Sequence, residues 1–73
     1  MSTNDNVDTK LSAREFVVER EGYKGYMTEY DFGWKWEIDQ NDELFHYGAA
    51  LSPSAAIRNI ESMINVFLRS NAG

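Results

Sequence analysis

The sequence predicts an α+β fold, in which a three-stranded antiparallel β-sheet meander is followed by one C-terminal helix packed on one face of the sheet. Two patterns predict this fold: apolar and charged residues alternate strictly over residues 34–39, and a Ser-Pro helix-start signal precedes apolar residues at helical spacing. The chain has 73 residues, which suffices for one small domain. We expect a polar tail, disordered when free, over residues 1–10, a single domain over residues 11–70 and a frayed end over residues 71–73.

The three strands are expected over residues 23–30, 34–39 and 44–51, and the short connections between them favour a meander. Alternation in the second strand places Phe32, Trp34, Trp36 and Ile38 on one face and Lys35, Glu37 and Asp39 on the other. Residues 40–43 are all polar and predict a hairpin turn. In the third strand, Phe45, Tyr47, Ala49 and Leu51 share a face, so that His46 points to the open side if that face lies under the helix.

Residues 14–20 allow two interpretations, either of which adds a short N-terminal element. Their β-branched and aromatic residues favour a short strand. Alternatively, Ser12 could cap a helix, with Glu15 completing a capping box.

The C-terminal helix is the clearest element. Ser52 suits the N-cap, because its hydroxyl accepts a backbone N–H bond, and Pro53 at the first helical position loses no needed donor. The residues that follow place one apolar stripe along the helix: Ile57, Ile60, Ile64, Phe67 and Leu68. One helix covers one face of a small sheet, so the other face is left for water or a partner.

Composition excludes several functions. Twelve acidic and seven basic residues give a net charge of −5, which opposes general binding to nucleic acid or to anionic membranes. The chain has no cysteine, which excludes a disulfide scaffold and a thiolate metal site. It also shows no signal peptide or membrane span, and we expect a cytoplasmic protein.

No catalytic or metal-binding motif emerges from the spacing. His46 is the only histidine and has no companion ligand, so it is interpreted as a surface residue. The acidic run from Asp39 has Leu44 and Ala50 where a calcium loop needs glycine and glutamate. We therefore expect no enzyme, no metal and no cofactor.

The charge pattern points to protein binding instead. Residues 29–43 contain six acids (Glu29, Asp31, Glu37, Asp39, Asp42, Glu43) and one base (Lys35), and therefore carry the whole net charge of −5. Aromatic residues are interleaved with these acids. An acidic, aromatic-rich surface suits a basic groove on a protein partner. The simpler alternative is that the aromatic residues form the core and the acids keep the domain soluble.

A family resemblance covers about half of the chain, from residue 23 to residue 60. The residues that carry it are Tyr23-x-x-Tyr26, Asp31-Phe32-x-Trp34-x-Trp36, Gly48-x-x-Leu51-Ser52 and Ile57-Arg58. This pattern resembles the MmoD (MMOD) family, the small auxiliary proteins encoded in soluble methane monooxygenase operons. The resemblance implies a non-enzymatic regulatory protein that binds the diiron hydroxylase component, competes with its regulatory component and acts as an inhibitor.

By analogy with that family, the expected partner-binding residues are Tyr23, Tyr26, Asp31, Phe32, Trp34 and Trp36. The family also has aromatic-containing extensions that this sequence does not show, so binding without inhibition is one expected outcome. A proposed role of the family in copper-dependent regulation does not suggest direct ligation here, since His46, Met1, Met27 and Met63 do not cluster.

Two alternatives remain open from sequence. Three strands followed by a helix is also the layout of a nucleic-acid-binding module, although the strands offer few bases besides Lys24 and Lys35. A small homodimer could instead bury its open sheet face against a second copy.

Overall fold

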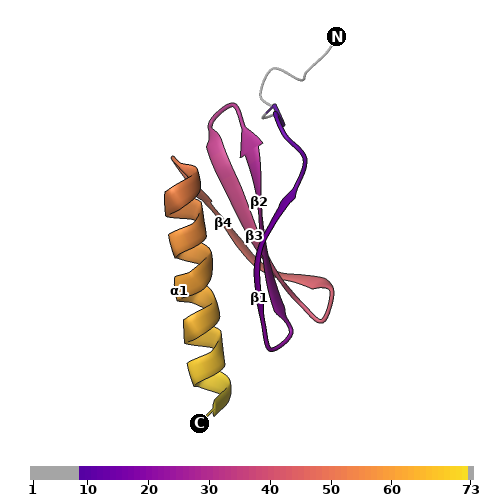
Figure 1. Ribbon diagram of the computed structural model, residues 1–73, viewed down its shortest axis with the longest axis vertical. Helices are drawn as coiled ribbons and strands as arrows, with labels where there is room; N and C mark the ends of the chain where they lie inside the picture. The colour runs from indigo at the N-terminus through magenta and orange to yellow at the C-terminus, as the bar shows by residue number, and fades with distance from the viewer. Residues whose placement is uncertain (1–8, 73) are drawn as a thin grey trace.

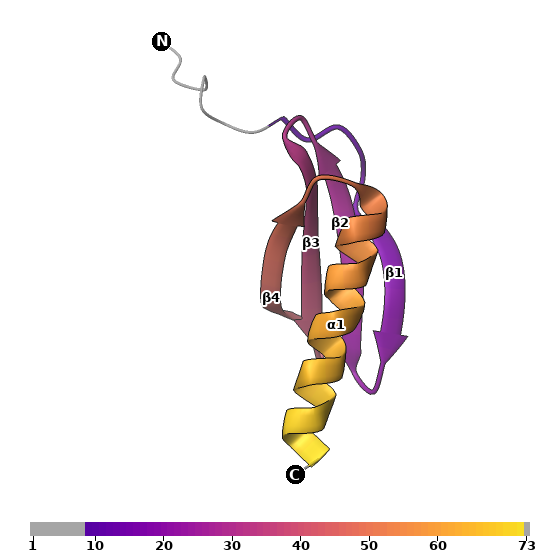
Figure 2. The same ribbon diagram turned by 90° about the vertical axis from the view of Figure 1, so that its left-hand side faces the viewer.

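The computed structural model describes residues 9–72, which form one four-stranded antiparallel sheet followed by one helix (Figure 1). The strands are β1 (Glu15–Arg20), β2 (Tyr23–Tyr30), β3 (Gly33–Gln40) and β4 (Glu43–Ala50), and the helix is α1 (Pro53–Ala72). The strands lie in the sheet in chain order, β1-β2-β3-β4, as a meander (Figure 2). Residues 1–8 of the expected tail, and Gly73, lie outside the described residues.

The predicted α+β class with one C-terminal helix is confirmed, but the prediction of three strands is wrong. The additional strand is β1, one of the two interpretations allowed for residues 14–20, and it pairs antiparallel with β2. A helix at this position would leave the backbone groups on one side of β2 without strand partners. The pairing continues further upstream, because Leu11 donates a backbone hydrogen bond to Glu29 (2.7 Å) and Asp31 donates one to Thr9 (2.9 Å).

Two hairpins depend on residues with positive φ. Glu21 and Gly22 have φ of 49° and 90° between β1 and β2, and Asn41 and Asp42 have φ of 53° and 69° between β3 and β4. Two consecutive positive values are what a type I′ two-residue hairpin requires. The polar segment 40–43 thus forms the hairpin turn that its composition predicts.

The helix begins as predicted. The backbone N–H of Ala55 donates to the Ser52 hydroxyl (3.2 Å), and the N–H of Ala56 donates to the Ser52 carbonyl (3.0 Å). The helix crosses one face of the sheet, and its C-terminal turns extend past the ends of the strands (Figure 2). Residues from both layers form the buried core: Tyr23, Met27, Trp36, Ile38, Ala56, Ile60 and Ile64.

A β-bulge in β4 changes which face His46 occupies. Ile38 pairs with His46 but Asp39 pairs with Leu44, so Phe45 is the extra residue. His46 lies 5.7 Å from the ring centre of Phe67 on the helix, and Phe45 lies 4.9 Å from the same ring. The expectation that His46 faces the open side, with Tyr47 beneath the helix, is therefore wrong, because strict alternation does not survive the bulge.

Candidate protein-binding surface

Within residues 9–72, the one helix lies against one face of the sheet, and we call the opposite face the uncovered face (Figure 1). Residues opposite one another on antiparallel strands point to the same side. The register places Phe16, Tyr26, Glu37 and Tyr47 in one row across all four strands. Phe16 is 60% exposed and Tyr47 is 61% exposed, so this row ends in an accessible aromatic ring at each edge.

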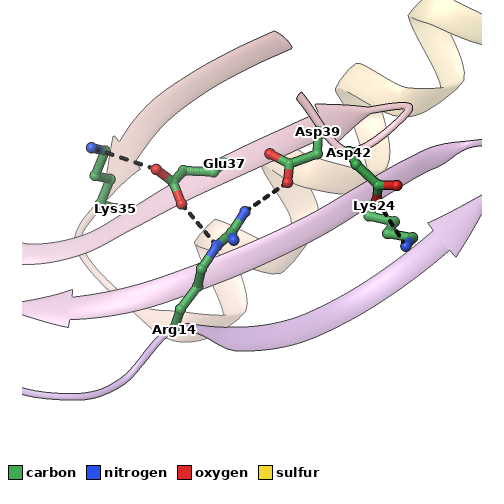
Figure 3. Close-up of polar contacts among 6 residues, drawn as sticks. All are labelled: Arg14, Lys24, Lys35, Glu37, Asp39 and Asp42. Atoms are coloured by element: carbon green, nitrogen blue, oxygen red, sulfur yellow. Dashed lines mark hydrogen bonds and ion pairs between the residues drawn. The ribbon is translucent and has the colours of Figure 1, made fainter. Parts of the chain in front are cut away.

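Charged side chains also lie on this face, and Figure 3 shows the ion pairs that they form. Arg14, which precedes β1, contacts Asp39 through Nη2 (2.9 Å to Oδ2) and Glu37 through Nε (3.2 Å to Oε1). The guanidinium carbon also lies 3.7 Å from the ring centre of Tyr26, within cation–π range. Lys35 approaches the second oxygen of Glu37 at 3.7 Å. Glu37 and Asp39 are therefore each paired with a cation.

The pairing shifts the ionisation of Arg14. Partial burial lowers the pKa of Arg14, but the hydrogen bond to Asp39 and the charges of Asp39 and Glu37 outweigh that effect and raise it. The Asp39 side chain is 13% exposed and would otherwise be a nearly buried charge without a cation.

A hollow of about 410 Å³ lies on the uncovered face, lined by Lys10, Arg14, Thr28, Tyr30, Lys35, Glu37, Asp39 and Leu44. Its lining mixes three basic and two acidic side chains with aromatic and apolar groups. Within residues 9–72, no three His, Cys, Asp or Glu side chains are grouped as a metal site needs.

The acidic residues predicted to form one surface are distributed over the molecule. Glu37 and Asp39 lie on the uncovered face with their cations. Asp31 lies in the turn between β2 and β3, whereas Asp42 lies in the hairpin between β3 and β4 and pairs with Lys24 at 3.2 Å. Because successive hairpins alternate between the two ends of a meander, these acids are separated by the length of β3.

The six residues predicted to bind a partner do not form one surface. Tyr23 and Trp36 are buried beneath the helix, and half-buried Trp34 packs against the same core. Tyr26 lies on the uncovered face, next to Phe16 at 5.8 Å between ring centres. Asp31 and Phe32 occupy the β2–β3 turn.

Phe32 extends the uncovered face at that turn. It is 40% exposed, and its ring stacks on Tyr30 at 5.3 Å between centroids. Sequence reasoning missed Arg14, Phe16 and Tyr47 as residues of the uncovered face. Phe16 lies opposite Tyr26. Its place on the uncovered face could have been inferred from the sequence only if β1 and the register of β1 with β2 had been recognised.

The fold and this face define a small α+β domain with an aromatic and charge-paired sheet surface. The model of the family described as MmoD, methane monooxygenase component D, matches residues 16–68. The chain belongs to this family of auxiliary methane monooxygenase components, which confirms the resemblance seen in the sequence. The match runs from β1 through most of α1 and thus spans the sheet and the helix that covers it.

No curated protein matches the chain. Within residues 9–72, none of the helical structure could span a bilayer as an apolar helix.

Proposed function

We propose that this chain binds the hydroxylase component of a soluble diiron methane monooxygenase through its uncovered face and lowers turnover, without catalysing a reaction itself. The observation that carries the proposal is the row Phe16, Tyr26, Glu37 and Tyr47, which crosses the four-stranded sheet of a member of the component D family. Aromatic residues dominate the energetics of protein interfaces, since they bury large areas with few rotatable bonds.

The charges on this face support binding to a protein rather than to nucleic acid. Arg14, Lys24 and Lys35 each lie within 4 Å of a carboxylate oxygen. A phosphate backbone would have to compete with those carboxylates. A protein partner can instead contact these ion pairs without breaking them, because their charges are already compensated within the domain.

Three of the six residues expected from the family resemblance belong to the proposed contact surface. These are Tyr26, Asp31 and Phe32, and Phe16, Tyr30 and Tyr47 join them. In this proposal Tyr23, Trp34 and Trp36 support the face from beneath the sheet, where they pack against the helix. The net charge of −5 favours a basic groove as the docking site on the hydroxylase.

The test measures binding and turnover with a purified soluble methane monooxygenase hydroxylase. We expect a stable complex and reduced turnover, with affinity that falls as salt rises from about 50 to about 500 mM. Phe32→Ala and Phe16→Ala should each weaken binding by at least about tenfold. The matched control is Val66→Ala, since Val66 is 41% exposed on α1 and Phe32 is 40% exposed at the sheet.

Three outcomes decide the proposal. Loss of affinity and of inhibition in the Phe variants, with the Val66 variant unchanged, supports it. Failure of the wild-type chain to bind the hydroxylase contradicts it. Equal weakening by Val66→Ala would contradict the uncovered face as the docking surface.

A further inference from the structure

The outer edge of the sheet at β4 exposes a line of large apolar side chains. Leu44 is 55% exposed, Phe45 48%, Tyr47 61% and Leu51, just after the strand, 89%. These are four of the eight large hydrophobic residues that are exposed in the part of the chain that the structure describes. Exposed apolar residues gathered in this way mark an interaction site.

These side chains lie on both sides of the sheet. Leu44 and Tyr47 pair with Asp39 and Glu37 and therefore point to the uncovered face. Phe45 points to the helix side, where it contacts Phe67 at 4.9 Å between ring centres. A partner that covered one face would leave part of the set in water. Only a partner that joins the edge itself would cover both sides.

The two edges of the sheet differ in their protection against such pairing. Strand β1 carries Glu15, Glu19 and Arg20, and its register shifts at a bulge between Phe16 and Val18. Charges and bulges are the devices that keep a sheet edge from pairing with another strand. The sequence of β4 from Leu44 to Ala50 contains no Lys, Arg, Asp, Glu or Pro. Its bulge lies near the start, so residues 46–50 remain regular.

We propose that β4 pairs antiparallel with β4 of a second copy of this chain, so that two four-stranded sheets become one continuous sheet. A second copy fits because an antiparallel two-fold pairing matches β4 with an equally uncharged edge. The one acidic residue of the strand, Glu43, stands at its first position. Two-fold pairing separates the two Glu43 side chains by the length of the strand, about 23 Å.

This arrangement keeps both binding faces accessible. A two-fold axis perpendicular to the sheet leaves both helices on one side and both uncovered faces on the other. Small residues at the end of the strand, Gly48, Ala49 and Ala50, allow close approach of the second backbone. The pairing is independent of the hydroxylase and can be tested without it.

The salt dependence of dimer formation distinguishes edge pairing from electrostatic docking. Two chains of net charge −5 repel each other, whereas the paired edges contribute apolar contacts and backbone hydrogen bonds. The dimer should therefore become stronger as salt rises, which is opposite to the expectation for docking in a basic groove.

The experiment is sedimentation velocity on the full chain from about 1 μM to about 1 mM, at about 50 and about 500 mM salt. Tyr47→Glu places a charge on the proposed edge and should weaken dimerisation by at least about tenfold. Phe16→Glu is the matched control, because it adds the same charge at a residue of equal exposure on the opposite edge. Circular dichroism establishes that both variants are folded.

A second measurement follows the backbone directly. Amide hydrogen exchange in β4 should slow as wild-type concentration rises, while exchange in β1 stays unchanged. A wild-type chain that remains monomeric throughout the range overturns the proposal. So does a dimer that Phe16→Glu weakens as much as Tyr47→Glu, which would indicate face-to-face association through the uncovered face, where both residues lie.

Discussion

Gly48 of β4 lies directly against the indole ring of Trp36, its neighbour across the sheet in β3. A β-carbon on residue 48 would lie 2.4 Å from Cζ2 of the ring and 2.7 Å from Cε2. Trp36 is 6% exposed and fixed between the sheet and the helix, so the ring cannot move aside. The absence of a side chain at residue 48 is thus what allows Trp36 to fill the core.

Gly48→Ala should lower the free energy of unfolding by about 1–3 kcal/mol, because overpacking forces the buried ring or the strand to shift. The loss outweighs the gain of about 0.4–1 kcal/mol that alanine brings by restricting the unfolded chain. Urea denaturation at a fixed, low protein concentration measures the change. Ala49→Val is the control at the neighbouring exposed position and should change stability by less than about 0.5 kcal/mol. Equal stability of Gly48→Ala and wild type would contradict this packing.

The close approach of the helix to β2 depends on Gly25 in the same way. A β-carbon at Gly25 would lie 2.4 Å from Cγ2 of Ile60, which is completely buried. Gly25→Ala should therefore cost about 1–3 kcal/mol in the wild-type background.

A double-mutant cycle tests whether Ile60 is the cause of that cost. Leucine at residue 60 has no methyl group on Cβ, so Gly25→Ala should cost at least about 0.5 kcal/mol less in the Ile60→Leu background. The free energies of unfolding of the four proteins give the coupling. If the effects of the two substitutions on the free energy of unfolding were strictly additive, the contact between Gly25 and Ile60 would not be the cause of the cost of Gly25→Ala.

Arg14 should stabilise the uncovered face through its two carboxylates. Arg14→Gln leaves Asp39, whose side chain is 13% exposed, without its cation. Because the Arg14 side chain is itself 42% exposed and screened by water, we expect a loss of only about 1 kcal/mol. Denaturation at low and high salt measures the change, which should shrink as salt rises.

Two further variants separate charge from geometry at residue 14. Arg14→Lys retains the charge but cannot contact Glu37 and Asp39 in the same planar arrangement, and should recover only part of the stability. Arg58→Gln on the exposed side of α1 is the matched control and should leave stability unchanged within about 0.5 kcal/mol. Full recovery by lysine would show that net charge alone accounts for the effect.

The Lys24–Asp42 pair predicts that the free energy of unfolding depends on pH in the alkaline range. The hydrogen bond that Lys24 donates to Asp42, together with the charge of Asp42, raises the pKa of Lys24 above its ordinary value of 10.5. A raised pKa in the folded protein contributes stability that is present below pH 10.5 and is lost as pH rises through the folded value.

Asp42→Asn should return the pKa of Lys24 towards its ordinary value and remove this part of the pH dependence. Heteronuclear NMR of the Lys24 side chain measures the titration in both proteins. An unchanged Lys24 titration in Asp42→Asn would contradict the pairing.

The sequence by itself determined the elements that depend on local chemistry. Ser52 and Pro53 define the helix start through backbone donors within one turn, and alternation over residues 34–39 defines the central strand. The polar residues 40–43 determine a hairpin because Asn41 and Asp42 tolerate positive φ. In each case the decisive interactions join residues that are close along the chain.

Tertiary structure decided which side each residue faces and what it meets there. The bulge at Phe45 turns His46 towards the helix, which no periodicity reveals. Pairing with β2 makes residues 15–20 a strand, and Arg14 then reaches Glu37 and Asp39 on β3. These relationships depend on register and on contacts between residues distant in the chain. The same register buries Tyr23 and Trp36 but exposes Phe16 and Tyr47, so the composition of the uncovered face follows from the assembled sheet.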